Sequence, residues 1–291
     1  MEILRDPREM RGWSREQGRA GLRLALVPTM GALHQGHLAL VRLGRQLADA
    51  VVVSLFVNPT QFGPHEDFSR YPRSFEQDRR LVEAEGAAAL YAPTAEAMYP
   101  SGFQTRIELP ALGALLCGAS RPGHFAGVAT VVCKLLHQVT PQVAIFGEKD
   151  WQQLTIIRRL VTDLNLDVSI VGHPIVRETD GLAMSSRNVY LDATGRRAAR
   201  ALSRALRLAR SLARPGFVTE TLLDEVQALL ANEPLAQIDY ACCVQQHTLQ
   251  NALQVDDDTR LLLAVRIQNT VRLIDNALLL GSAEGLSTLS S

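Results

Sequence analysis

Two histidines three residues apart are the side chains whose type and spacing most directly suggest chemistry. His34 and His37 lie in the sequence GALHQGH, residues 31–37, which follows a short apolar run. On the first turn of a helix, side chains at positions i and i+3 share one face, with Cβ atoms about 5–6 Å apart. Both imidazoles could then contact one anion, toward which free backbone N–H groups and the positive end of the helix dipole would also point. The pattern predicts a phosphate site; the alternative is a pair of exposed histidines at a frayed helix start.

A strand, a tight turn and a helix must position these histidines. Residues 24–27 are apolar, as in a strand buried on both faces, and we expect this strand to end at Pro28, which cannot donate a ladder hydrogen bond. Gly31 permits the turn, and Gly36 leaves room for a flat ring or a sugar to approach the backbone. A helical spacing of apolar residues begins at about His34.

Lys149 stands in a second unit of the same kind. Residues 143–146 predict a short buried strand, 147–150 its exit turn and 151–164 an amphipathic helix. Because ligands of open α/β sheets bind outside the carboxyl ends of the strands, we expect the compact ammonium of Lys149 to contact the same phosphates. The alternative is an ordinary solvated lysine in a turn. The only other lysine, Lys134, falls inside an expected helix, where a structural role is predicted.

Three further polar segments are candidates for the same edge of the sheet. Asn58 and Gln61 follow an apolar run, although an asparagine and a proline after a strand can simply make a turn. The loop 118–127 contains Arg121 and His124, which suits a flexible cover over an anionic ligand or an ordinary long loop. A third segment, 176–188, ends in two serines, an arginine and an asparagine, whose polar groups can form hydrogen bonds with a triphosphate as it changes shape.

The remaining pattern predicts the fold class. Apolar runs alternate with helical patterns through the first part of the chain, which indicates an α/β, Rossmann-like parallel sheet with helices on both faces. The strands of this sheet are expected at residues 24–27, 50–57, 87–91, 143–146 and 166–171, with a possible short strand at 105–109. Helices are expected in the opening residues, from Ser74 with Gln77 completing a capping box, in a short segment ending near Gly118, and at 128–139 and 151–164.

The pattern of predicted helices and strands changes after Tyr190, which predicts a second, smaller domain. Two helices rich in arginine and leucine, 193–213 and 218–231, precede alternating strands at 238–244, 261–267 and 271–274, as in an α+β domain with an antiparallel sheet. We expect one domain over residues 1–175 and the second over 176–291, with a disordered tail after about residue 280.

Composition excludes several classes of protein. The 291 residues carry no net charge, which argues against a nucleic-acid-binding protein. No apolar run reaches membrane-spanning length, and the charged opening residues do not resemble a signal peptide, so no membrane partner is expected and a cytoplasmic enzyme is predicted. The four cysteines lack metal-ligand spacing and are expected to be reduced core thiols.

Six ordered segments together resemble a known family. They are PTMGALHQGH (28–37), FVNPTQF (56–62), RYPR (70–73), GASRPGHFAGV (118–128), FGEKDWQQL (146–154) and DGLAMSSRN (180–188), with a weaker match at RLIDN (272–276). In this order they resemble the pantothenate synthetases, the ligases of pantoate and β-alanine, which belong to the HxGH nucleotidylyltransferases. The resemblance implies that ATP and pantoate give a pantoyl adenylate and pyrophosphate, and that β-alanine then displaces AMP to give pantothenate. It also implies Mg²⁺ and a homodimer.

The resemblance assigns roles residue by residue. His37, His34, Lys149 and Arg187 would be catalytic. The ATP site would comprise Met30, Gly31, Ala32, Leu33, His34, Gln35, Gly36, His37, Gly147, Glu148, Lys149, Asp150, Val176, Met184, Ser185, Ser186 and Arg187. Gln61 and Gln153 would bind pantoate, Gln61 would also face β-alanine, and Asn58, Tyr71 and Arg121 would line the pocket. The sequence does not identify metal ligands.

Two alternatives to this ligase are a nucleotidyltransferase acting on a phosphorylated substrate and a nucleotide-binding sensor without turnover. The neutral amides of Gln61 and Gln153 argue against the first, because a phosphorylated substrate calls for arginine or lysine. Retention of Lys149, of both histidines and of Arg187 argues against the second.

Overall fold

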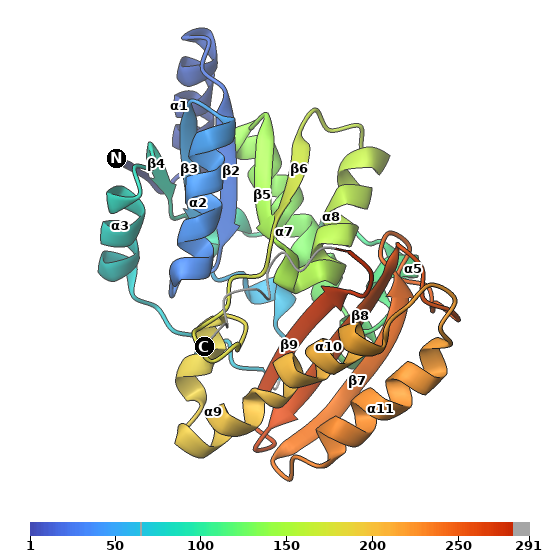
Figure 1. The fold of residues 1–291 in the computed structure, drawn as a ribbon. Helices are drawn as coiled ribbons and strands as arrows, with labels where there is room; N and C mark the ends of the chain where they lie inside the picture. Colours follow the sequence, from blue (N-terminus) through green and yellow to red (C-terminus); the bar gives the residue numbers. More distant parts are fainter. Residues whose placement is uncertain (65, 282–291) are drawn as a thin grey trace. The chain divides into compact units, whose positions relative to one another are not determined.

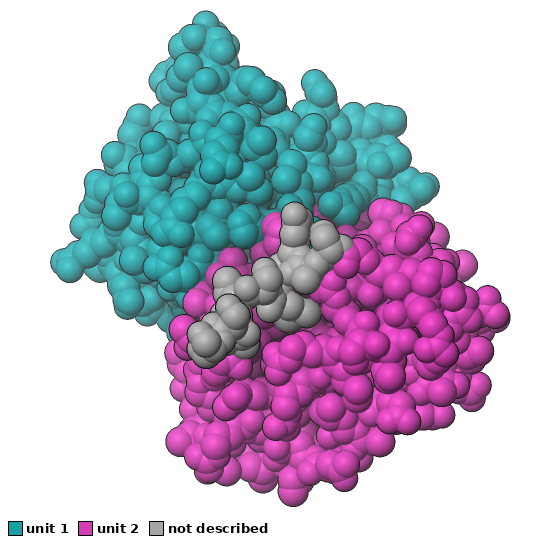
Figure 2. Space-filling model, viewed as in Figure 1, with its two compact units in different colours: residues 1–148, 156–173 teal, residues 149–155, 174–291 magenta. Residues whose placement is uncertain are grey.

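A computed structural model describes residues 1–64 and 66–281, which form two compact units (Figure 1). Unit 1 comprises Met1–Glu148 and Ile156–His173, and unit 2 comprises Lys149–Thr155 and the chain from Pro174 onward (Figure 2). The disordered tail expected after about residue 280 falls on residues 282–291, which lie outside the described part of the chain.

Unit 1 is built on a parallel sheet of six strands in the order β1-β4-β3-β2-β5-β6. The strands are β1 (Glu2–Leu4), β2 (Leu24–Thr29), β3 (Ala50–Leu55), β4 (Ala89–Tyr91), β5 (Val143–Gly147) and β6 (Ser169–His173). The predicted α/β class is therefore confirmed. The sequence missed β1, because three residues are too few to show a periodic pattern.

Helices cover both faces of this sheet (Figure 1). On one face α2 (Gln35–Leu47) and α3 (Phe75–Ala84) form a core with Ala25 and Val27 of β2. Because side chains of a strand alternate between faces, the buried Leu24 and Leu26 point to the other face, where α1 (Pro7–Arg19) and α7 (His124–Val139) pack. The chain goes from β2 to β3 in one direction and later to β5 in the other. The carboxyl ends of β2 and β5 therefore flank the switch point at which such sheets bind ligands.

Short helices and α8 complete unit 1 and its links to unit 2. They are η1 (Pro59–Gln61), α4 (Ala95–Met98), α5 (Pro110–Gly113), α6 (Cys117–Ser120), η2 (Glu148–Asp150) and α8 (Trp151–Asp163). Lys149 and Asp150 of η2 and the first residues of α8, up to Thr155, belong to unit 2, and the rest of α8 belongs to unit 1.

The strand β2 does not end at Pro28, as the sequence suggested, but continues to Thr29. Pro28 lies opposite Ser54 in the register with β3. The pairing of β2 with β5, on its other side, covers only Ala25 and Leu26. A proline beyond Leu26 therefore removes no ladder bond on that side, which makes it compatible with the strand.

The segment 105–128 also differs from the prediction. Residues 105–109 form no strand, since the backbone N–H of Ile107 donates to the Thr130 hydroxyl of α7 (3.0 Å) rather than to a neighbouring strand. The expected short helix is divided into α5 and α6, with Leu116 at a φ of 48° before α6. The loop expected at 118–127 contains α6 and the first turn of α7, so it is not the long flexible cover that its glycines suggested.

The capping box predicted at Ser74 is absent. Ser74 precedes α3, but its side chain makes no capping hydrogen bond. Its ψ of 56° departs from the extended conformation in which an N-cap hydroxyl can accept from the helix start.

Unit 2 is an α+β fold, as predicted. Its antiparallel sheet has the order β7-β8-β9. Its elements are η3 (Ser186–Tyr190), α9 (Ala193–Ala199), α10 (Ala201–Leu212), α11 (Thr219–Ala231), β7 (Ala236–Gln245), β8 (Thr259–Ile267) and β9 (Val271–Leu278). The predicted helix 193–213 is broken at Arg200. Each strand is longer than predicted. Leu202 and Leu206 of α10 pack with Leu222 of α11 and Leu263 of β8 in one buried core.

A buried carboxylate on α3 fixes the turn after β2. Asp78 is 2% exposed and accepts hydrogen bonds from the backbone N–H groups of Ala32 (2.9 Å) and Leu33 (2.8 Å). Gly31 has a φ of 85°, and a Cβ there would lie 3.1 Å from the Asp78 carboxylate. The turn therefore requires glycine and an acceptor from a helix that follows it by more than forty residues.

Replacement of Asp78 by alanine should lower the free energy of unfolding by about 2–4 kcal/mol, because two backbone donors, at least one of them buried, lose a charged acceptor. Urea denaturation followed by circular dichroism measures this change. Glu76→Ala, on the same helix and exposed, is the control and should change stability by less than about 0.5 kcal/mol. Equal losses in the two variants would contradict the role assigned to Asp78.

Candidate active site

The two histidines cap the first turn of α2. The His34 Nδ1 accepts from the backbone N–H of Gly36 (3.2 Å), and the His37 Nδ1 accepts from the backbone N–H of His34 (3.3 Å). The ring centroids lie 4.0 Å apart. A neutral imidazole that accepts at Nδ1 carries its hydrogen at Nε2, so both rings present an Nε2–H donor.

This arrangement corrects one expectation. We expected free backbone N–H groups at the start of α2 to face the anion, but those of Gly36 and His34 are occupied by the imidazoles, and that of His37 donates to the His34 carbonyl (2.8 Å). The histidines therefore satisfy backbone donors at the start of the helix.

Two buried amides lie after β3. Asn58 is 1% exposed, and its Nδ2 donates to the Gln61 side-chain oxygen (3.0 Å) and to the Gly127 carbonyl (3.1 Å). The Gln61 Nε2 contacts the Met30 sulfur (3.0 Å), which places Gln61 next to the turn after β2. A Cβ on Gly127 would lie 2.3 Å from the Thr60 carbonyl, so only glycine lets α7 pack this closely against η1. Asn58 thus orients the Gln61 side chain by donating a hydrogen bond to its amide oxygen.

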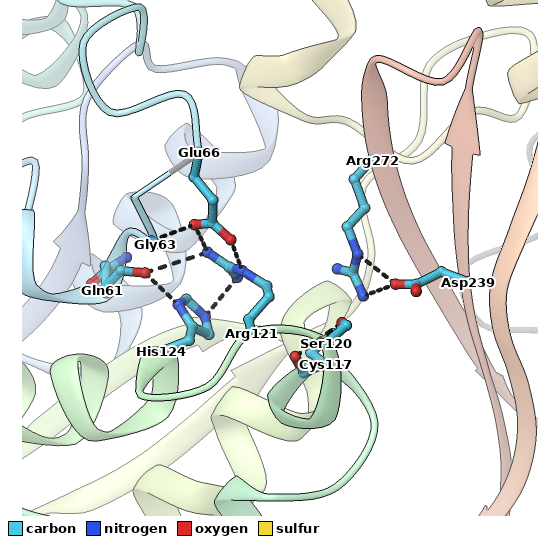
Figure 3. A network of polar contacts seen from close by, with 9 residues as sticks. All are labelled: Gln61, Gly63, Glu66, Cys117, Ser120, Arg121, His124, Asp239 and Arg272. Carbon is cyan, nitrogen blue, oxygen red and sulfur yellow. Dashed lines mark hydrogen bonds and ion pairs between the residues drawn. The ribbon is translucent and has the colours of Figure 1, made fainter.

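Arg121 lies in a cluster with Glu66, His124 and Gln61 (Figure 3). Its guanidinium binds the Glu66 carboxylate through two hydrogen bonds, of 2.5 and 2.6 Å. The His124 Nδ1 lies 2.7 Å from the Gln61 carbonyl and must donate to it, which leaves Nε2 to accept from Arg121 (2.9 Å). Burial raises the pKa of Glu66, but the hydrogen bonds and charge of Arg121 outweigh burial and hold this pKa below its ordinary value.

Tyr71 and Lys134 contribute packing in unit 1. Tyr71 is buried and meets the ring of Phe62 edge-on, with centroids 5.9 Å apart. The Lys134 ammonium lies 4.8 Å from the centroid of Phe103 and 5.8 Å from that of Tyr99. Burial lowers the pKa of Lys134. These contacts agree with the structural role expected for this lysine.

Lys149 lies in unit 2, where a polar network holds its backbone. Its ammonium is 3.7 Å from the Asp150 carboxylate, and its side chain is 22% exposed. The Asn276 Nδ2 donates to its carbonyl oxygen (3.0 Å). Asn276 in turn accepts from Arg260, whose guanidinium stacks on the ring of Trp151. The Lys149 carbonyl is therefore held by a side chain of β9 that is itself bound by Arg260.

The segment 176–188 forms a hairpin followed by η3. The Met184 N–H donates to the Val176 carbonyl (3.0 Å), and Arg177 forms an ion pair with Asp275 that is almost fully buried. Asn188 donates to the Ala183 carbonyl (3.1 Å) and to the carboxylate of Glu178. These contacts hold the half-buried side chains of Met184, Ser185, Ser186 and Arg187 on an ordered loop.

A family model described as pantoate–β-alanine ligase matches residues 2–278 of the chain. The chain belongs to this ligase family. The match extends past the six segments that suggested it and through most of unit 2.

Individual relatives cover nearly the whole chain. The pantothenate synthetase of Geobacter sulfurreducens is 52% identical over 280 residues, which is 96% of this chain and 99% of the relative. That of Heliobacterium modesticaldum is 53% identical over 277 residues, 95% of this chain and 98% of the relative. A crystal structure of pantothenate synthetase from Thermus thermophilus has a TM-score of 0.90 at 45% identity, covering 97% of this chain and all of the other. A pantoate–β-alanine ligase from Francisella tularensis, complexed with β-γ ATP and β-alanine, has a TM-score of 0.80 at 32% identity, covering 97% of this chain and 99% of the other.

In this ligase family member the candidate residues form two groups, one in each unit. Unit 1 holds the residues of the turn and histidines, the amides after β3, and Tyr71, Arg121, Gly147 and Glu148, and within it Met30 and Gln61 are in contact. Unit 2 holds Lys149, Asp150, Gln153, Val176 and the loop Met184 to Arg187. Gln153 is half-buried on α8, next to the fully buried Gln152.

Sequence reasoning missed several residues that support these groups. They are Glu66, Asp78, Arg260 and Asn276. Only Asn276 gave a signal, as the last residue of the weakly matching RLIDN segment. The others carry ordinary polar side chains whose partners lie far away in the chain.

The described part of the chain contains neither a membrane-spanning helix nor a cluster of metal-binding side chains. In residues 1–64 and 66–281, no helix combines the length and apolar character needed to cross a bilayer. Within the same residues, no group of three or more histidine, cysteine, aspartate or glutamate side chains is arranged to hold a metal ion. All four cysteines, which lie in the described residues, are in the thiol form, and Cys117, Cys133 and Cys243 are buried.

Replacement of Arg121 by glutamine should make stability depend differently on pH. Because the folded pKa of Glu66 is lowered, its stabilisation is present above the unfolded glutamate pKa of about 4.3 and is lost as the pH falls through the lower folded value. At pH 7 the variant should lose about 1–3 kcal/mol of unfolding free energy, and this difference should shrink as the pH falls below about 4.

Urea denaturation at several pH values tests this expectation. Arg79→Gln, which breaks exposed pairs with Glu76 and Glu83, is the control and should change stability by less than about 0.5 kcal/mol. A difference between wild type and the Arg121 variant that stays constant down to pH 3 would show that Glu66 is not its source.

Proposed function

We propose that this chain condenses pantoate with β-alanine to pantothenate, consuming ATP and releasing pyrophosphate and AMP. The observation that carries the proposal is its likeness to pantoate–β-alanine ligases over nearly its whole length. The chain is thus an ATP-dependent ligase. A nucleotidyltransferase acting on a phosphorylated substrate and a nucleotide sensor without turnover are not favoured, because relatives at about half identity are ligases from end to end.

In the first step a pantoate carboxylate oxygen attacks the α-phosphorus of ATP. The new oxygen–phosphorus bond forms as the bond between the α-phosphorus and the bridging β-phosphate oxygen breaks, and pyrophosphate leaves with that electron pair. Two anions must approach, so positive charge and in-line positioning contribute more than proton transfer. Lys149 and Arg187 supply the charge, and Gly147, Glu148, Asp150, Val176, Met184, Ser185 and Ser186 line the nucleotide site.

His34 and His37 act as hydrogen-bond donors to phosphate oxygens in this proposal. Because Nδ1 of each ring accepts from the backbone, each neutral ring carries its hydrogen at Nε2. Each ring can donate this hydrogen bond without carrying a positive charge. The carboxylate oxygen becomes part of the anhydride and requires no proton. We therefore assign His37 an electrostatic role in the transition state rather than that of a general acid. Met30, Gly31, Ala32, Leu33, Gln35 and Gly36 complete the turn that surrounds the nucleotide.

Gln61 and Gln153 bind pantoate, because amides can pair with hydroxyls and a carboxylate without adding charge. In the second step the β-alanine nitrogen attacks the carbonyl carbon of the adenylate; the new carbon–nitrogen bond replaces the bond to AMP, and the nitrogen loses a proton. Gln61 also faces this amine. Asn58 orients Gln61, while Tyr71 and Arg121 form the surrounding wall.

Mg²⁺ would bind at this site together with the nucleotide. Mg²⁺ usually binds through one or two carboxylates together with substrate phosphates, rather than in a cage made only of protein groups. The Asp150 carboxylate, next to Lys149 and 48% exposed, would hold it with the ATP phosphates. The bound ion would neutralise phosphate charge.

A cytoplasmic homodimer completes the proposal. The dimer follows from the family resemblance, and the cytoplasmic location is the expectation drawn from composition in the sequence analysis. Light scattering after size-exclusion chromatography measures the mass of the assembly, and a mass equal to one chain would exclude the dimer.

The reaction is tested with ATP present throughout. AMP production should require both pantoate and β-alanine, whereas pyrophosphate release should require pantoate but not β-alanine. Lys149→Ala should slow single-turnover pyrophosphate release by about 10²–10³-fold, because one preorganised charge is removed. Arg159→Ala, an exposed cation on the same helix as Trp151, is the control and should leave the rate unchanged. An unchanged rate in the Lys149 variant would contradict its role.

Replacement of Gln61 by alanine should raise KM for pantoate by roughly 10-fold or more and leave KM for ATP nearly unchanged, because a buried polar contact to one substrate is lost. Steady-state kinetics with each substrate varied in turn measures the two values. Gln77→Ala, an exposed amide of unit 1, serves as the control. Equal increases for both substrates would show that Gln61 does not discriminate between them.

A further inference from the structure

Two adjacent polar residues are buried in the strand β9. Asp275 is 2% exposed and Asn276 is 3% exposed. Buried polar groups are costly unless they form hydrogen bonds, so two in succession on a strand need partners that justify them. Asp275 binds Arg177, and Asn276 reaches another part of unit 2.

Each polar atom of the Asn276 side chain has a defined partner. Its Nδ2 donates to the Lys149 carbonyl (3.0 Å), and its Oδ1 accepts from Arg260 (2.5 Å). A carbonyl only accepts and a guanidinium only donates, so the orientation of the amide is fixed by its neighbours. The Asn276 backbone N–H donates to the side-chain carboxylate of the preceding residue, Asp275 (2.9 Å).

Arg260 connects this amide to the beginning of α8. Its guanidinium carbon lies 3.4 Å from the ring centroid of Trp151, whose Nε1 donates to the Gln246 carbonyl (2.8 Å). Trp151 follows Lys149 by two residues. The short stretch from Lys149 to Trp151 is therefore held at both ends, at the first by Asn276 and at the second by Arg260, and the two are hydrogen-bonded to each other.

We propose that Asn276 is a positioning residue for Lys149 in adenylate formation. Holding the carbonyl fixes the peptide plane after Lys149, and hence the direction in which its side chain leaves the backbone. This inference rests on the proposed role of Lys149. Misplacement of a reacting or charged group by about 1 Å can cost about 10²-fold in rate, so a single backbone contact can be felt in the chemistry.

Asn276→Asp removes this contact and also adds a negative charge, and the double-mutant cycle described below separates the two effects. A carboxylate keeps the size of the side chain and its pairing with Arg260, but it cannot donate to the Lys149 carbonyl. Single-turnover pyrophosphate release separates the two ways in which the variant could act. A change in folding lowers the amplitude, whereas loss of positioning lowers the rate constant at an unchanged amplitude. We expect a fall in the rate constant of roughly 10–100-fold.

A double-mutant cycle with Lys149→Ala shows whether Asn276 acts through the lysine. In the Lys149→Ala background, Asn276→Asp should cause little further loss, because no ammonium remains to be positioned. Thr219→Val is the matched control. It removes another hydrogen bond from a buried side chain to a backbone carbonyl in unit 2, that of Ala252 (2.6 Å), and should lower the thermal midpoint without changing the rate constant.

The outcomes separate this inference from the proposed function. A loss of the same factor with and without Lys149, or an unchanged rate constant in Asn276→Asp, overturns the positioning role while the ligase reaction stands. An unchanged rate in Lys149→Ala overturns both the role of the lysine and the inference. Failure of the wild-type chain to form AMP from ATP, pantoate and β-alanine overturns the proposed function itself.

Discussion

Backbone groups left unpaired where strands end and helices begin must find hydrogen-bond partners, and this constraint shapes the candidate site. Asp78 accepts from the turn after β2, His34 and His37 accept from the start of α2, and Asn276 donates to the carbonyl of Lys149. In each case a side chain satisfies the backbone of a segment proposed to bind nucleotide. The contacts that allow these segments to fold therefore also fix the positions from which they act.

Charge compensation determines which groups remain available for anionic substrates. Arg121 is bound by Glu66 through two hydrogen bonds, and Arg177 is bound by Asp275 in the same manner. Their charges are used to hold structure, since a buried charge without a partner is strongly unfavourable. Lys149 is different, because its ammonium lies 3.7 Å from Asp150, beyond a short hydrogen bond, and both side chains are partly exposed. A cation held this loosely can exchange its partner for a phosphate at little cost.

The class of the fold could be predicted because it depends on local pattern. Continuous apolar runs such as 24–27 and 143–146 indicated parallel strands, and helical spacing indicated the elements between them. The errors arose where a tertiary contact decides the conformation. Pro28 stays in β2 because the side of the strand that faces β5 is unpaired there. Ile107 forms no strand, and its N–H donates to the Thr130 hydroxyl of α7. The sequence contains no local signal for either contact.

The residues that could act on a substrate were easier to predict from the sequence than the residues that support them. Histidine, lysine and glutamine at strand ends indicate a possible binding site by their residue type and their position in the chain. Asp78 and Asn276, in contrast, contact segments 45 and 127 residues away. The Asn276 amide donates to a backbone carbonyl, a group that every residue has, so no pairing of residue types in the sequence could reveal this contact. A resemblance can mark such a position, as the RLIDN segment did, but only the geometry of the amide shows that its donor is directed at Lys149 and its acceptor at Arg260.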